Sequence, residues 1–93
     1  MIGEMVIYQI KPDFKHEFNL VYEQMCFAFS KCQGYVKHEH IKHFHPDEIY
    51  CDTWYFESLG CAENASHIFK CLPQAKIFMS SVEKVIYKAH FEL

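Results

Sequence analysis

The spacing of apolar residues changes along this chain, and the order of the changes restricts the possible folds. Residues 14–32 carry apolar side chains three and four positions apart, which predicts an amphipathic helix of about five turns. Residues 2–11 before it are β-branched and aromatic and end at Pro12, which predicts a strand. Asp13 stands where the N-cap of the helix is expected, and Gly34 stands where its stop is expected.

The second half of the chain repeats this change between strand and helix. Residues 35–43 and 49–57 are strand-like, and the Pro-Asp pair between them supplies turn chemistry, which predicts a hairpin. Residues 59–71 and 73–81 both have helical spacing, and the proline between them can open a helix but cannot continue one. Residues 82–92 alternate apolar and charged side chains, which predicts a last strand.

This β-α-β-β-α-β order predicts a ferredoxin-like α+β fold. Its four strands would form one antiparallel sheet, with the helices on a single face. A chain of 93 residues has room for one domain, so we expect residues 1–93 to form a single unit. The strand at 49–57 has bulky side chains on both faces, and such a strand is usually covered on both. A second copy of the chain is the simplest second cover, which predicts a homodimer.

Composition and charge argue against several classes of binding partner and of structural site. All nine basic residues are lysine and the net charge is −3, so the chain lacks the arginine forks that read phosphates and bases, and we expect no nucleic-acid partner. Five cysteines without CxxC spacing argue against a disulfide framework and a tetrahedral zinc site. The N-terminal segment does not resemble a signal peptide, and no apolar run approaches the roughly 18 residues of a membrane span. We therefore expect a cytoplasmic protein with reduced thiols and no membrane partner.

Several short motifs, in this order and spacing, resemble the antibiotic biosynthesis monooxygenase-like domains of the dimeric α+β barrel superfamily. The motifs are VIYQIKPDFKHEF, CQGYVKHEHIK, YCDTWYFES and LPQAKIFMSSV. Together they span nearly the whole chain. The resemblance implies a homodimeric α+β barrel, in which two protomers stack their sheets and each keeps a pocket between its own sheet and helices.

The resemblance also implies an activity. Some members oxygenate or oxidise polyphenolic or quinol rings with O2 and without metal or flavin, and others degrade haem. The strand-three tryptophan that lines the pocket in those proteins matches Trp54 here. Gln74 replaces the histidine of the family's helical tail. The haem-degrading members carry an asparagine on strand one and a histidine late in the second helical region. Strand one here has no asparagine and LPQAKIF has no histidine, so we expect no haem. The members that use O2 without metal or flavin imply that no other cofactor is needed.

Four histidines lie close together in the predicted hairpin: His38, His40, His43 and His45. The period of a strand puts His38 and His40 on one face, His43 on the other and His45 in the turn. At most two can converge, whereas zinc and copper sites need three or four ligands, so we expect no metal site. The histidines are then either polar residues on a partly solvated hairpin or part of a functional cluster.

If the hairpin turns symmetrically about its proline, His40 faces Asp52 and His38 faces Trp54. A register shift of one residue would remove both pairs. A carboxylate beside an imidazole fixes its tautomer and raises its basicity, so His40 could take a proton from a bound phenol. The indole of Trp54 would offer the ring a flat wall. The residues predicted as catalytic are His40, Asp52 and Trp54, and those predicted to bind substrate are His38, Tyr50 and Trp54.

Two functions of different classes follow. The first is a cofactor-free monooxygenase or oxidase that uses O2 on a small phenolic or quinol-type aromatic molecule. The second is a non-catalytic dimeric module of the same fold, which binds a small apolar ligand or only assembles. The sequence leaves open whether the chain is catalytic and which molecule it binds.

Overall fold

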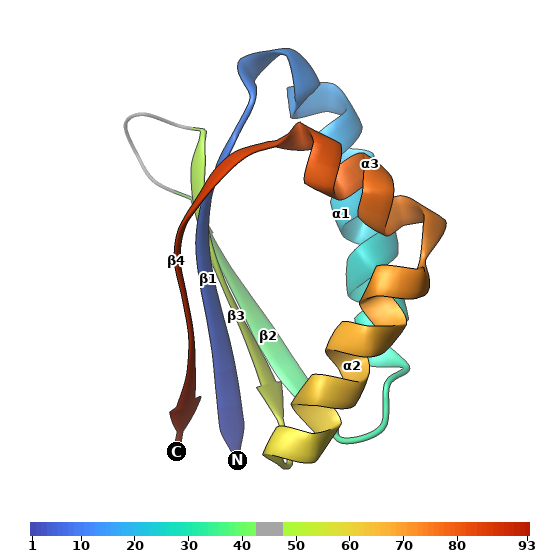
Figure 1. Ribbon diagram of the computed structural model, residues 1–93, viewed down its shortest axis with the longest axis vertical. Coiled ribbons are helices and arrows are strands. Elements are labelled where there is room, and N and C mark those ends of the chain that lie inside the picture. The colour runs from blue at the N-terminus through green and yellow to red at the C-terminus, as the bar shows by residue number, and fades with distance from the viewer. Residues whose placement is uncertain (43–47) are drawn as a thin grey trace.

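Four antiparallel strands form one sheet, and the helices of the described residues lie on one of its faces (Figure 1). The computed structural model describes residues 1–42 and 48–93. In chain order the elements are β1 (Ile2–Ile10), the short 3₁₀ helix η1 (Pro12–Phe14), α1 (Lys15–Ser30), β2 (Tyr35–Lys42), β3 (Ile49–Phe56), α2 (Leu59–Cys71), α3 (Pro73–Ser81) and β4 (Val82–Glu92). The strand order is β2-β3-β1-β4, so the predicted ferredoxin-like α+β fold is confirmed.

The start and end of the first long helix differ from the prediction. Asp13 is not its N-cap, because Asp13 lies inside η1 and Phe14 precedes α1 without a capping side chain. Pro12 explains the difference, since its fixed φ begins a helical turn directly after β1. The helix ends at Ser30, two residues earlier than expected. Gly34 does adopt the left-handed conformation predicted for it, with φ at 80°.

The core lies between the sheet and the helices. α1 buries the apolar stripe predicted from its spacing, which includes Phe18 and Met25. On the sheet side, every second residue of β3 is buried: Tyr50, Asp52, Trp54 and Phe56. One face of β3 therefore points at the helices, and it carries a carboxylate whose burial requires hydrogen-bond donors. None of the described helices has the length and apolar character needed to cross a bilayer.

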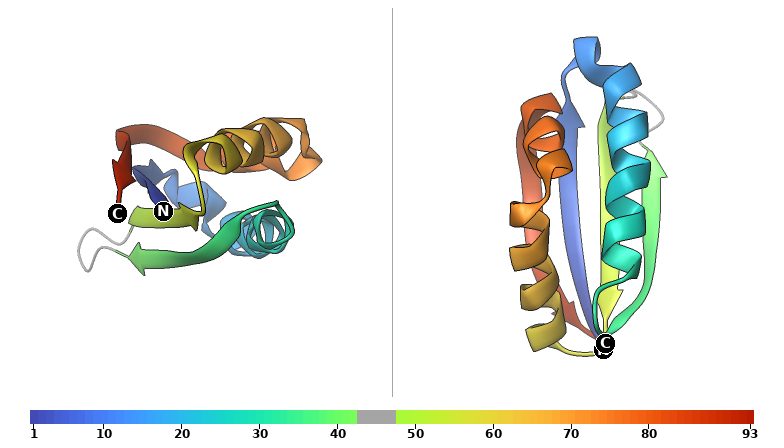
Figure 2. Two further views of the ribbon diagram at one scale, coloured as in Figure 1. Left: turned by 90° about the horizontal axis from the view of Figure 1, so that it is seen from below. Right: turned by 90° about the vertical axis from the view of Figure 1, so that its right-hand side faces the viewer.

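The opposite face of the sheet carries none of the described helices, as the two layers in Figure 2 show. Strand pairing places Ile41, Tyr87 and Phe91 on this open face, where they are 59%, 47% and 43% exposed. Apolar side chains gathered on one exposed face are typical of an interaction surface. A homodimer through the open face stays a prediction.

We expect the protein to sediment at micromolar concentration as a species of twice the 11.1 kDa of one chain. Ile7 lies on the open face between Cys51 and Tyr87. Ile7→Lys would place a charge in the middle of the interface and should shift the equilibrium to monomer. Ile77→Lys, the same change at an exposed position of α3, should leave the dimer intact. An unmodified chain that sediments only as monomer would contradict the dimer.

Candidate active site

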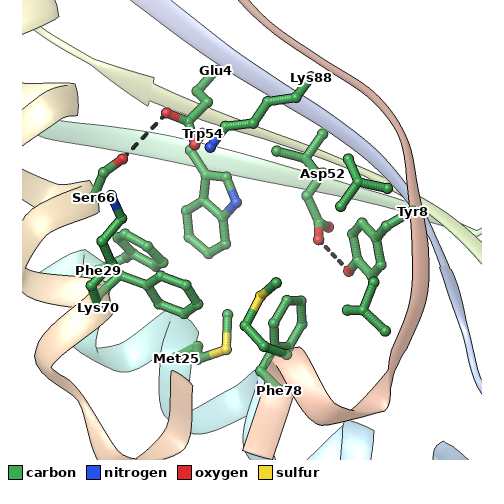
Figure 3. A pocket seen from close by; sticks show the side chains of 15 residues that line it. Glu4, Tyr8, Met25, Phe29, Asp52, Trp54, Ser66, Lys70, Phe78 and Lys88 are labelled. Atoms are coloured by element: carbon green, nitrogen blue, oxygen red, sulfur yellow. Dashed lines mark hydrogen bonds between the residues drawn. The ribbon is translucent and has the colours of Figure 1, made fainter. Parts of the chain in front are cut away.

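A cavity of about 360 Å³ lies between the sheet and the helices. β1, β3 and β4 form one wall, and α1, α2 and α3 form the other. Most of the lining is apolar (Figure 3): Val6, Met25, Phe29, Trp54, Phe69, Phe78, Met79, Val82 and Val85. A cavity of this size and character suits a small ring system.

One part of this lining departs from the predicted alternation of the last strand. A strict period of two would put Val85 and Tyr87 on the same face of β4. The register of β4 against β1 shifts between Ile7 and Tyr8, so Val85 lies opposite Tyr8 and faces the cavity. Tyr87 remains on the open face. An irregularity of this kind reorients a strand's side chains without any signal in their spacing.

Asp52 on β3 is the polar centre of the site, and only 3% of it is exposed. The hydroxyl of Tyr8 donates to its Oδ2, and the hydroxyl of Tyr22 donates to its Oδ1 at 2.9 Å. Nδ1 of His40 also hydrogen-bonds Oδ1. These partners come from β1, α1 and β2, and together they compensate the carboxylate for the loss of water. Because an ionised carboxylate only accepts, the hydrogen of this last bond lies on Nδ1 of His40.

The two tyrosines hold Asp52 and stay protonated. Burial, followed by the charge of the Asp52 carboxylate, raises the pKa of Tyr8 and of Tyr22 far above the ordinary value. At physiological pH both phenols are therefore donors rather than bases. Tyr8 and Asp52 also line the cavity, so a ligand hydroxyl there would meet the carboxylate and the phenol oxygen together (Figure 3).

The hairpin register predicted from the sequence is present. His40 pairs with Asp52, and His38 pairs with Trp54. His40 lies farther from the cavity than we expected for a residue that takes a proton from the substrate, however. Asp52 lines the cavity, but His40 does not, and the side chain of His40 is 29% exposed behind the carboxylate. The group that a bound ligand would meet is therefore Asp52.

Trp54 lines the cavity, and His38 lies behind it. The two rings stack with their centroids 4.4 Å apart and their planes 17° from parallel. His38 Nε2 is 3.5 Å from the sulfur of Cys26, and its Nδ1 is 3.1 Å from the hydroxyl of Tyr35. His38 is not part of the lining, so its place in this geometry is to hold the indole.

Tyr50 also stands apart from the cavity. Its ring packs against Phe18, Tyr8 and His40, with centroids 4.9, 5.9 and 5.1 Å away. These contacts place Tyr50 in the core beside the polar centre, although we expected it, like His38, to touch the substrate. Of the residues predicted to bind substrate, the cavity lining includes Trp54 alone.

The partial burial of His38 leads to a prediction about acid stability. Burial lowers the pKa of His38 from its ordinary 6.5, because the charged imidazolium would lose water. The unfolded chain then binds this proton at a higher pH than the folded chain, so stability is lost as pH falls below about 6.5. We expect the melting temperature to fall between about pH 7 and pH 5, and to fall less in His38→Phe, which keeps a stacked ring.

His67→Phe is the matched control, because His67 is exposed on α2. Its melting temperature should follow the same pH dependence as the unmodified chain. Equal slopes for His38→Phe and the unmodified chain would contradict the assignment.

Metal ligands are not gathered in the described part of the chain. Outside residues 43–47, no three His, Cys, Asp or Glu side chains are placed to hold one ion. His43 and His45 lie outside the described residues, and so do their predicted positions on the other face and in the turn.

The same fold occurs in solved structures. A variant of SnoaB, a cofactor-independent oxygenase from Streptomyces nogalater, matches with a TM-score of 0.85 and 15% identity, over 99% of this chain and 91% of that one. A candidate antibiotic biosynthesis monooxygenase from Bordetella bronchiseptica matches with a TM-score of 0.79 and 11% identity, over 99% and 95%. A conserved protein from Methanosarcina mazei Go1 matches with a TM-score of 0.76 and 14% identity, over 97% and 87%. No family model and no curated protein sequence matches the chain.

Proposed function

We propose that this chain is a cofactor-free monooxygenase or oxidase that uses O2 on a small phenolic or quinol-type aromatic substrate. It has the fold of the antibiotic biosynthesis monooxygenase-like proteins. The observation that carries the proposal is a buried carboxylate, Asp52, in the wall of an apolar cavity beside Tyr8 and Trp54. The cofactor-independent oxygenase among the similar structures supports this reaction class by analogy of fold.

The first step is the removal of a proton from the bound ring. The aromatic body fills the apolar part of the cavity against the indole of Trp54, and a ring hydroxyl points to Asp52. The carboxylate takes the phenolic proton, while Tyr8 and Tyr22 keep it in position. Few groups in this cavity can solvate the resulting phenolate, so its electrons are more readily given up than in water.

The oxygen chemistry then balances without another reactant. The phenolate passes one electron to O2, which gives a phenoxyl radical and superoxide, and the two combine to form one bond between oxygen and a ring carbon. The proton on Asp52 returns to the peroxide. Cleavage of the O–O bond with loss of the ring-carbon proton leaves a quinone and water. One phenol and one O2 thus give one quinone and one water. A quinol instead transfers two electrons and two protons, which gives a quinone and hydrogen peroxide.

In this scheme Asp52 is the base, and His40 connects Asp52 to solvent. Asp52 is buried and needs a route for protons to and from water. His40 hydrogen-bonds Asp52 and is partly exposed, so its imidazole can pass a proton between the carboxylate and solvent. This role differs from the direct base expected from the sequence, because Asp52 lines the cavity and His40 does not.

The proposal is tested by oxygen consumption in protein treated with a metal chelator. A panel of hydroquinones and naphthols should be consumed, whereas their methyl ethers should not, because an ether has no proton for Asp52 to remove. If these rings quench the fluorescence of Trp54 but none is consumed, the chain is the non-catalytic ligand-binding module instead.

A further inference from the structure

Two lysines line the same cavity from opposite walls. Lys70 belongs to α2 and Lys88 to β4. In Figure 3 both side chains extend toward the part of the cavity bounded by Glu4 and Ser66, whereas Tyr8 and Asp52 lie on the other side. The polar groups therefore gather at two separate ends, with apolar walls between them.

The Glu4–Ser66 end has an excess of positive charge. Among the described residues, neither Lys70 nor Lys88 has an ion-pair or hydrogen-bond partner. Glu4 is already engaged, because its Oε2 lies 2.8 Å from Nε2 of His90 and 3.5 Å from the hydroxyl of Ser66. Two ammonium groups and one carboxylate leave a net charge of +1 at this end, although the whole chain carries −3. Local positive charge beside an apolar cavity favours an anion there.

We propose that the cavity takes a hydroxyaromatic acid. Its ring lies in the apolar middle, its hydroxyl meets Asp52, and its carboxylate lies between Lys70 and Lys88. Glu4 would repel further negative charge, so the preferred ligand carries a single anionic group. The hydroxyl end of this assignment rests on the proposed function, whereas the carboxylate end rests on the two lysines.

The carboxylate end can be tested by binding alone. Trp54 is the only tryptophan in the chain and lines the cavity, so its fluorescence reports occupancy. Naphthalene carboxylate and the matching naphthalene carboxamide have nearly the same shape and differ in charge. Neither carries a phenol, so their binding does not depend on turnover. We expect the carboxylate to bind about tenfold more tightly, and the difference to shrink at high salt.

Charge reversal identifies the cations responsible. Lys88→Glu and Lys70→Glu should each abolish the preference for the carboxylate, as measured by the ratio of the two dissociation constants. Lys84→Glu is the matched control, because Lys84 also belongs to β4 but pairs with Gln9 and is not part of the lining. It should leave the ratio unchanged. Equal binding of the two ligands by the unmodified chain, or an equal effect of Lys84→Glu and Lys88→Glu, would overturn the proposal.

The two proposals fail in different ways. If the carboxylate is preferred but no hydroxyaromatic compound is consumed, the anion site stands and the oxygenase function is wrong. If neutral phenols are consumed and the carboxylate is not preferred, the oxygenase function stands and the anion site is wrong.

Discussion

Asp52→Asn should reduce the turnover number for oxygen uptake by about a thousandfold. Asparagine has nearly the same size as aspartate but cannot take the phenolic proton. The amide also replaces one acceptor oxygen with an NH2 donor. Either Tyr8, which donates to Oδ2, or the pair Tyr22 and His40, which donate to Oδ1, then loses its acceptor. Initial rates of oxygen uptake at saturating phenol, in protein whose circular dichroism matches that of the unmodified chain, measure the effect.

Two further variants separate chemistry from general charge effects. Asp13→Asn, the same change at an exposed carboxylate in η1, should leave the turnover number unchanged. His40→Gln should slow turnover only about tenfold, because Asp52 remains as base and only its connection to solvent is weakened. A near-normal rate in Asp52→Asn would remove Asp52 from the mechanism. A larger loss in His40→Gln than in Asp52→Asn would return the role of base to His40.

Gly34→Ala should lower the free energy of unfolding by about 3 kcal/mol, or the melting temperature by roughly 15 °C. Gly34 has a φ of 80°, which an alanine adopts only under strain. A Cβ at this position would also lie 2.5 Å from the sulfur and 2.7 Å from the Cβ of Cys61, so the start of α2 would have to move. Urea unfolding followed by circular dichroism measures the change.

Gly60→Ala makes the same chemical change where neither problem exists. Its Cβ would meet only the Ser58 hydroxyl oxygen, at 3.8 Å, and alanine favours the helical conformation of α2. We expect this variant to gain roughly 0.5–1 kcal/mol of stability. An unchanged unfolding midpoint in Gly34→Ala would show that the connection before β2 relaxes without loss.

The order of the helices and strands, and hence the fold, could be predicted from the sequence. The spacing of apolar residues within one helix or strand is a local property, so the boundaries of α2, α3 and β4 could be predicted to the residue. The pairing of His40 with Asp52 also followed from the sequence once the hairpin was taken as symmetric about its proline, because side chains alternate with a period of two along both strands. The part of the site that lies within one hairpin was therefore visible in the sequence.

Which of these residues faces the cavity depends on how distant parts of the chain pack together. Tyr8 and Tyr22 lie 44 and 30 positions from Asp52 along the chain, and they reach it only when β1 pairs with β3 and α1 packs on the sheet. Their positions in the sequence gave no sign that they share a carboxylate. The placement of Val85 likewise depends on a register shift against β1. The alternation of side chains along a strand specifies the face of the sheet on which each one lies. How close a side chain comes to the cavity depends on how the sheet and the helices pack. For this reason Asp52 lines the cavity and His40 does not.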